Sequence, residues 1–176
     1  MDVAINYTVE SIAEITKGKI IQQVPGPQLT HLLLDSRKLL FPRSTIFFAI
    51  TNPHQKGSAF IKVLYEKDVR YFVIDDKKFD ISLYPGATFI LVENVLHALH
   101  LLAIRHRQTY AIPVLGITGS NGKTMVKEWL FQLLQKDFNI IRSPKSYNSQ
   151  IGVPLSVLQI ENQHAMAIFE AGISQP

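Results

Sequence analysis

The segment GITGSNGKT, at residues 116–124, limits most strongly what this 176-residue chain can fold into. It overlaps the end of a continuous apolar run, IPVLGIT (112–118), of the kind that parallel sheets bury on both faces. The clearest helical pattern of the chain follows, and its apolar stripe, which we expect in the core, contains Val126, Trp129, Leu130, Leu133 and Leu134. A strand, a glycine-containing turn and a helix in this order are typical of a loop that holds phosphate at a helix N-terminus.

This loop differs from the most common phosphate loop, G-x-x-x-x-G-K-[ST], because Ile117 stands where its first glycine would be. Gly119 and Gly122 still permit the positive φ angles that a nest of backbone amides requires. Lys123 can reach the β- and γ-phosphates, and the Thr124 hydroxyl can bind Mg²⁺. An ordinary glycine-rich turn between a strand and a helix is the alternative interpretation.

Composition indicates a globular protein, with 47% hydrophobic and 18% charged residues. The formal net charge is +4, but the basic residues are scattered, which favours a solvated basic face or an anionic ligand. No motif indicates nucleic-acid binding. The chain has no cysteine, which excludes disulfides and thiolate metal sites. We find no signal peptide and no apolar run long enough to span a membrane, so we expect a cytoplasmic protein.

Short strands and helices alternate along the chain, which favours parallel α/β structure. We expect strands at 19–21, 31–34, 44–50, 70–74, 88–92, 112–118, 138–141 and 165–171. Helices are expected after Thr8, from Gly57, over 95–108 and after the glycine loop. The histidines of the 95–108 helix, His97, His100 and His106, are expected on its surface. A domain boundary near Asn94 divides the chain into residues 1–94 and 95–176.

Several segments carry a family resemblance. TGSNGKT (118–124) is similar to the ATP loop of the Mur ligases, T-G-[TS]-[NS]-G-K-[TS], which also lacks the outermost glycine. LLLDSRKLLFPRSTIFFAI (32–50) and HQKGSAFI (54–61) resemble signatures of the UDP-binding first domain of that family. KSYNSQIGVPLSVLQI (145–160) and AIFEAGIS (167–174) resemble segments of the members that add D-alanyl-D-alanine. The segments follow one another in family order and cover nearly the whole chain.

The resemblance implies an α/β fold: a small N-terminal α/β domain for a UDP substrate, then the start of a parallel-sheet, phosphate-loop ATPase domain. It implies ligation of D-alanyl-D-alanine to UDP-N-acetylmuramoyl-tripeptide through an acyl phosphate in peptidoglycan synthesis, with ATP and Mg²⁺. Some such ligases are fused in front of an alanine racemase, and the resemblance leaves open such a domain after Pro176.

The resemblance also implies roles for residues of the second domain. Its nucleotide-binding residues would be Gly119, Ser120, Asn121, Gly122, Lys123 and Thr124. Lys123 would neutralise charge on the transferred phosphate, Asn148 would lie near the phosphates, and Thr124 and Glu170 would bind Mg²⁺, which prefers hard oxygen ligands. The alternative roles are a helix cap or ion pair for Glu170 and a turn residue for Asn148. Ser149 departs from the family pattern, which has a second asparagine there.

In the first domain, the resemblance places Ser36 and Arg37 at the nucleotide end of the UDP-sugar. His54 and Gln55 would contact uracil or ribose, although a solvated histidine is the simpler alternative. Asp35 is interpreted as an anchor of the turn between two strands.

Two other functions compete with the ligase. One is a UDP-sugar-binding regulatory module without ligase chemistry, against which Lys123 and Glu170 argue. The other is a relative of the folylpolyglutamate synthetases, which lack a first domain of this kind. The carbamylated lysine, adenine-binding residues and C-terminal domain of the Mur ligases would lie beyond Pro176. We therefore expect a chain truncated within its second domain, without ligase activity alone and with at most weak nucleotide affinity.

Overall fold

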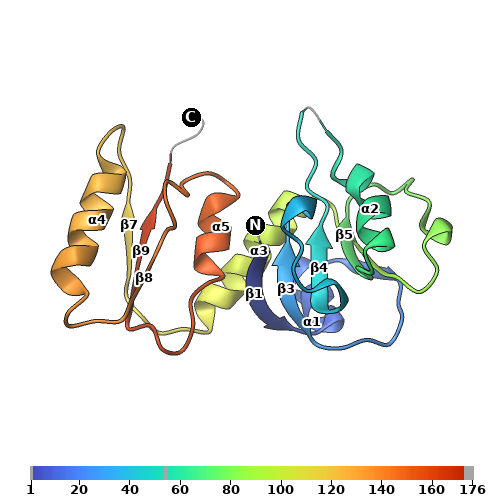
Figure 1. Cartoon of the computed structure of the whole chain (residues 1–176), viewed down its shortest axis with the longest axis horizontal. Coiled ribbons are helices and arrows are strands. Elements are labelled where there is room, and N and C mark those ends of the chain that lie inside the picture. Colours follow the sequence, from blue (N-terminus) through green and yellow to red (C-terminus); the bar gives the residue numbers. More distant parts are fainter. Residues whose placement is uncertain (1, 54, 173–176) are drawn as a thin grey trace. The chain divides into compact units, whose positions relative to one another are not determined.

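The computed structural model describes residues 2–53 and 55–172. Two compact units divide the chain, Met1–Leu102 and Ala103–Pro176. Their boundary falls within helix α3 (Val95–Gln108), past the predicted boundary near Asn94. Figure 1 shows the first unit in blue to green and the second in yellow to red.

The first unit is built on a six-stranded sheet with the strand order β1-β3-β4-β5-β6-β2. Its four central strands run parallel: β3 (Leu29–Leu33), β4 (Thr45–Phe48), β5 (Tyr71–Ile74) and β6 (Thr88–Leu91). The edge strands β1 (Asp2–Tyr7) and β2 (Lys19–Gln22) run antiparallel to their neighbours. Because the central strands are parallel, their C-terminal ends share one edge of the sheet, where α/β proteins place ligand-binding loops.

Helices cover the core of this sheet. Helix α1 (Val9–Thr16) begins at Thr8, whose hydroxyl accepts a hydrogen bond from the Ser11 amide, as expected for an N-cap. Helix α2 (Ile61–Glu66) follows the 3₁₀ turn η3 (Gly57–Phe60). The side chains of β4 and β5 are buried throughout, as the apolar run at 44–50 predicts. The core under α2 includes Phe47, Phe72, Phe89, Ile61 and Leu64.

The second unit is a three-stranded parallel sheet with the order β7-β9-β8. Its elements are β7 (Val114–Ile117), α4 (Lys123–Leu134), β8 (Ile140–Arg142), α5 (Gly152–Val157) and β9 (Met166–Glu170). Figure 1 shows α4 and α5 on either side of the strands. Along β9, Ala167 and Phe169 pack into a cluster with Ile160. Strand alternation therefore turns Glu170 toward the opposite face, which α4 covers.

Every strand and helix expected from the sequence is present, with small shifts at the ends. Strand β1 and helix α5 were not expected. The alternation of buried Val3 and Ile5 is a signal that would have revealed β1. Helix α5 has six residues, too few for a periodic apolar stripe to be recognised.

The predicted burial of the α4 stripe is wrong for Val126, Trp129 and Leu133, whereas Leu130 and Leu134 are half-buried. Trp129 is 59% exposed, and Val126 and Leu133 are also exposed, whereas Lys127 is fully buried. The helix turns its Lys127 face to the sheet because this lysine pairs with Glu170 on β9. The 112–118 strand is not buried on both faces either, since β7 lies at a sheet edge and Leu115 is 40% exposed.

His106 is buried, contrary to the expectation that all three histidines of α3 lie on its surface. Its ring Nε2 lies 2.9 Å from the carbonyl oxygen of Ile160 and therefore donates to it. Burial lowers the pKa of His106 below its ordinary value of 6.5, and the hydrogen bond to Ile160 opposes this shift only in part. The folded protein therefore favours the neutral form of this imidazole.

The buried His106 generates a pH prediction. Because its folded pKa is lowered, its contribution to stability is complete above pH 6.5 and is lost as the pH falls below that value. The His106→Gln variant keeps a donor for Ile160 but cannot be protonated. When the pH is lowered from about 7.5 to about 5.5, we expect the thermal midpoint of His106→Gln to fall less than that of the wild type.

His97→Gln is the matched control, since His97 is exposed on the same helix. It should behave as the wild type does in calorimetric melts at both pH values. If the thermal midpoints of the wild type and of His106→Gln fell equally between the two pH values, His106 would not be the source of the pH dependence.

Candidate functional site

The glycine loop turns from the end of β7 into the N-terminus of α4. Gly122 is the N-cap residue, with φ 77° and ψ −5°, and Gly119 has φ 141°. These are angles that residues with a Cβ rarely adopt, so both glycines are required by the backbone. The loop thus joins backbone amides to the positive end of a 12-residue helix, an arrangement that suits an anion.

Lys123, the first residue of α4, folds its side chain back over this loop. Its Nζ donates hydrogen bonds to the carbonyl oxygens of Gly119 at 2.6 Å and Ser120 at 3.5 Å. The ammonium is therefore held at the loop by neutral acceptors. An anionic phosphate oxygen would be a stronger partner for it than either carbonyl.

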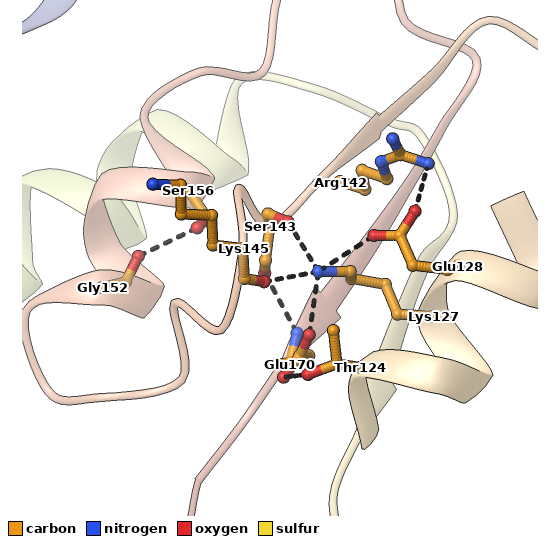
Figure 2. Close-up of polar contacts among 9 residues, drawn as sticks. All are labelled: Thr124, Lys127, Glu128, Arg142, Ser143, Lys145, Gly152, Ser156 and Glu170. Atoms are coloured by element: carbon orange, nitrogen blue, oxygen red, sulfur yellow. Dashed lines mark hydrogen bonds and ion pairs between the residues drawn. The ribbon is translucent and has the colours of Figure 1, made fainter. Parts of the chain in front are cut away.

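Thr124 and Glu170, separated by 46 positions in the sequence, meet directly. The Thr124 hydroxyl donates a 3.0 Å hydrogen bond to Oε2 of Glu170, which is completely buried at the end of β9. The amide of Glu170 donates to Oγ of Ser143 at 3.0 Å, which ties the end of β9 to the segment after β8. Figure 2 shows the contact between Thr124 and Glu170 at the N-terminal end of α4.

The oxygen atoms at this position suit a hard divalent cation. Lys127 Nζ lies 2.8 Å from Glu170 Oε1, and the two groups form an ion pair without hydrogen-bond geometry. Oε1 therefore has no hydrogen-bond donor among the described residues. No cluster of three or more histidine, aspartate or glutamate residues occurs in the part of the chain that the structure describes. Thr124 and Glu170 are the residues here that could hold Mg²⁺, a cation whose shell phosphate oxygens and water commonly complete.

Asn148 lies next to the same sheet edge. Its carbonyl accepts a 2.8 Å hydrogen bond from the Gly172 amide, two residues after Glu170, while the Ala171 amide donates to Ile117 at the end of β7. The structure therefore brings the segment of Asn148 beside the ends of β7 and β9. Asn148 also makes a local turn, because its amide donates to the Ser146 carbonyl.

Lys127 also belongs to this site, although it was not expected there from the sequence. It is completely buried and joins Glu170 to two backbone carbonyls. A signal was present, since Lys127 lies three residues after Thr124 and therefore on the same helix face.

In the first unit, Asp35 caps the 3₁₀ turn η1 (Ser36–Lys38) that follows β3. It accepts hydrogen bonds from the amide of Arg37 and from Nε and Nη2 of the Arg37 side chain. These bonds lower the pKa of Asp35 and raise that of Arg37. Asp35 thus anchors its turn, as the sequence indicates, while Arg37 is 86% exposed and accessible to a ligand.

Gln55 lies in a tight turn after β4, in which its backbone exchanges hydrogen bonds with Asn52. His54 lies outside the described residues. A hollow of about 390 Å³ opens at the C-terminal ends of β4, β5 and β6. Its lining includes Thr51, Lys56, Ser58, Asp75 and Asn94.

Ser36, Arg37 and Gln55 follow the ends of β3 and β4, at the same sheet edge as this hollow, but none of them lines it. Asp75 and Asn94 were not expected in a site. Asp75 comes directly after the predicted strand 70–74 and Asn94 lies two residues after the predicted strand 88–92, so the rule that ligands bind beyond the C-terminal ends of parallel strands would have indicated both.

The fold and the site together define an α/β protein with a glycine loop at a helix N-terminus beside a buried carboxylate. Residues 117–176 match the family described as the Mur ligase middle domain. The chain belongs to the Mur ligase family.

Relatives extend the match to the rest of the chain. The UDP-N-acetylmuramoyl-tripeptide–D-alanyl-D-alanine ligase of Bacillus subtilis is 30% identical over 172 residues, which make up 97% of this chain and 36% of the relative. MurF of Acinetobacter baumannii has a TM-score of 0.86 at 23% identity, covering 96% of this chain and 36% of that one. MurF ligase of Thermotoga maritima, solved in complex with ADP, has a TM-score of 0.70 at 26% identity. The match covers 82% of this chain and 32% of that one.

These likenesses confirm the predicted α/β fold class. The chain spans about a third of the length of the curated relatives it matches. Within the described residues, no helix is long and apolar enough to cross a membrane.

The contact between Gly172 and Asn148 generates a stability prediction. A Cβ added at Gly172 would lie 2.7 Å from the Asn148 carbonyl oxygen, so the two segments would have to move apart. We expect Gly172→Ala to destabilise the protein by about 1–3 kcal/mol, as overpacking commonly does. Urea unfolding followed by circular dichroism measures this change.

Gly116→Ala is the control, because a Cβ there meets nothing within 4 Å. We expect it to change the free energy of unfolding by less than about 0.5 kcal/mol. Equal stabilities of the two variants would mean that Gly172 and Asn148 are not in close contact.

Proposed function

We propose that this chain contributes the UDP-substrate domain and the phosphate loop of an ATP-dependent ligase. The ligase would join D-alanyl-D-alanine to UDP-N-acetylmuramoyl-tripeptide in peptidoglycan synthesis, in the cytoplasm. The two substrates are those that the name of the Bacillus subtilis relative gives, and the Thermotoga maritima relative was solved with ADP. A fused alanine racemase stays a prediction.

The observation that carries this proposal is the contact of Thr124 with the buried Glu170 carboxylate at the mouth of the glycine loop. A helix N-terminus alone would suit any anion. A hydroxyl and a carboxylate beside it add the oxygen donors that a magnesium–phosphate group requires. A module that only binds UDP-sugars would have no use for this pairing, and the match over 97% of the chain includes a first unit that the folate relatives lack.

In the proposed reaction the γ-phosphate passes to the terminal carboxylate of the tripeptide, giving an acyl phosphate and ADP. The amine of D-alanyl-D-alanine then attacks, forming the amide and releasing phosphate. Lys123 would exchange its loop carbonyls for phosphate oxygens, and the loop amides would hold the phosphate chain in place. Thr124 and Glu170 would bind Mg²⁺, which neutralises phosphate charge when bound, and Asn148 would border the phosphates.

Binding of the UDP substrate tests the first unit. Ser36→Ala and Arg37→Ala should each weaken the affinity for UDP-N-acetylmuramoyl-tripeptide by about tenfold, as the loss of a hydrogen bond to a charged group does. Isothermal titration calorimetry with this chain measures the change. Lys67→Ala is the control, because it also removes a positive charge but follows α2, before β5 begins. If both site variants bind as tightly as Lys67→Ala, the assignment of this site is wrong.

Ligation tests the second unit. We would use a chimera in which this chain replaces the matching N-terminal part of the Bacillus subtilis relative. Lys123→Met should lower kcat by about 10²–10³-fold, the usual effect of removing a group that stabilises transition-state charge. Lys136→Met, an equal change of charge at an exposed position just after α4, should leave kcat unchanged. Product formation followed by chromatography would contradict the proposal if Lys123→Met kept the wild-type rate.

A further inference from the structure

Lys127 is an unusual residue for a helix packed on a sheet, because its side chain is completely buried. Its Nζ lies 2.8 Å from Glu170 Oε1, 2.9 Å from the Ser143 carbonyl oxygen and 2.5 Å from the Lys145 carbonyl oxygen. Figure 2 shows the ammonium at the centre of these contacts. Glu128, at 3.4 Å, is a more distant fourth partner, and it also pairs with Arg142.

Removing an ammonium from water is costly, so a buried lysine needs a partner for each N–H and a counter-charge. Two donors of the Lys127 ammonium make hydrogen bonds to the Ser143 and Lys145 carbonyl oxygens, and the Glu170 carboxylate, 2.8 Å from Nζ, supplies the counter-charge. The lysine is therefore held in one orientation, and its partners are held with it.

The contacts of Lys127 join three separate segments of the chain. Lys127 itself lies in α4, one turn after Thr124, while Glu170 ends β9 and the two carbonyls begin the segment that leads to Asn148. Lys145 has φ 51°, a left-handed conformation that costs about 1–2 kcal/mol for a residue with a Cβ. A strained residue persists only where its surroundings fix it, and the hydrogen bond from Lys127 to its carbonyl does so here.

We propose that Lys127 is a positioning residue of the ligase site. It fixes the Glu170 carboxylate against Thr124 and places the 143–148 segment at the end of β9, so that the loop, the carboxylate and Asn148 keep one arrangement. This inference rests on the proposed function for its catalytic meaning, but the arrangement itself is testable without any ligand.

The first test is amide hydrogen exchange in this chain, comparing the wild type with Lys127→Met. The amides of Glu170 and Gly172 donate to Ser143 and Asn148 at the end of β9 near Lys127. The Ala165 amide donates to Asn139 at the opposite end of β9. We expect exchange at least about tenfold faster at Glu170 and Gly172, with Ala165 unchanged, since local opening is distinct from global unfolding.

A purely structural role would accelerate all three amides by the same factor, and that result, or no change at any of them, would overturn the proposal. Lys136→Met controls for the loss of one positive charge. The double variant Lys127→Met/Glu170→Gln guards against misfolding, because it leaves no unpaired buried charge. In it, Gly172 should still exchange rapidly, because the Ser143 and Lys145 carbonyls have lost their common donor, and slow exchange there would contradict the proposal.

Restoration of the ammonium provides a further check. The chain contains no cysteine, so Lys127→Cys carries a single thiol. Aminoethylation of that thiol in denaturant, followed by refolding, rebuilds a lysine-like side chain at this position. Slow exchange at Gly172 should return, and its failure to return in a refolded protein would contradict the proposal.

The catalytic meaning is tested in the chimeric ligase. Lys127→Met should lower kcat by about 10–100-fold, the usual effect of removing a residue that orients a metal ligand, with little change in KM for UDP-N-acetylmuramoyl-tripeptide. A wild-type kcat in this variant would overturn the role in catalysis. If the wild-type chimera itself made no product, the proposed function would fail, while the exchange result would still decide whether Lys127 positions this region.

Discussion

The second unit depends on one buried charge pair, that of Lys127 with Glu170. Neither group could be buried alone, because each would lose its hydration without compensation. Together they fix which face of α4 meets the sheet, and they draw in the backbone carbonyls of Ser143 and Lys145. The packing of this unit is therefore organised around a polar contact as well as an apolar cluster on the other face of β9.

This arrangement explains the apolar surface of α4. Lys127 shares its helix face with the half-buried Leu130 and Leu134, so only this part of the apolar stripe faces the sheet with it. Here Lys127 is inside, so that Trp129 and Leu133 are exposed. The exposed Leu115 on edge strand β7 belongs to the same unit. Fuller burial of the apolar stripe would require a different orientation of α4. The observed orientation is the one that forms the contact between Lys127 and Glu170.

The two units, each considered by itself, place polar groups in the same way. In both, parallel strands end at one sheet edge, and the residues that follow those ends gather there. In the first unit these are the turn of Asp35 and Arg37 and the hollow lined by Asp75 and Asn94. In the second they are the glycine loop and Glu170. A sheet core with fully buried strands gives such loops a rigid base.

The sequence by itself determined what depends on neighbouring residues: the order of strands and helices, the glycine loop with its positive φ angles, the Asp35 cap and the family. The family resemblance assigned Thr124 and Glu170 to one magnesium site, but only the tertiary structure showed the hydrogen bond that joins them across 46 positions. The tertiary structure alone also decided that Lys127 is buried, that Trp129 is not, and that His106 lies against Ile160. The physical reason is that backbone conformation is set locally, whereas burial of a charge depends on partners that distant segments supply.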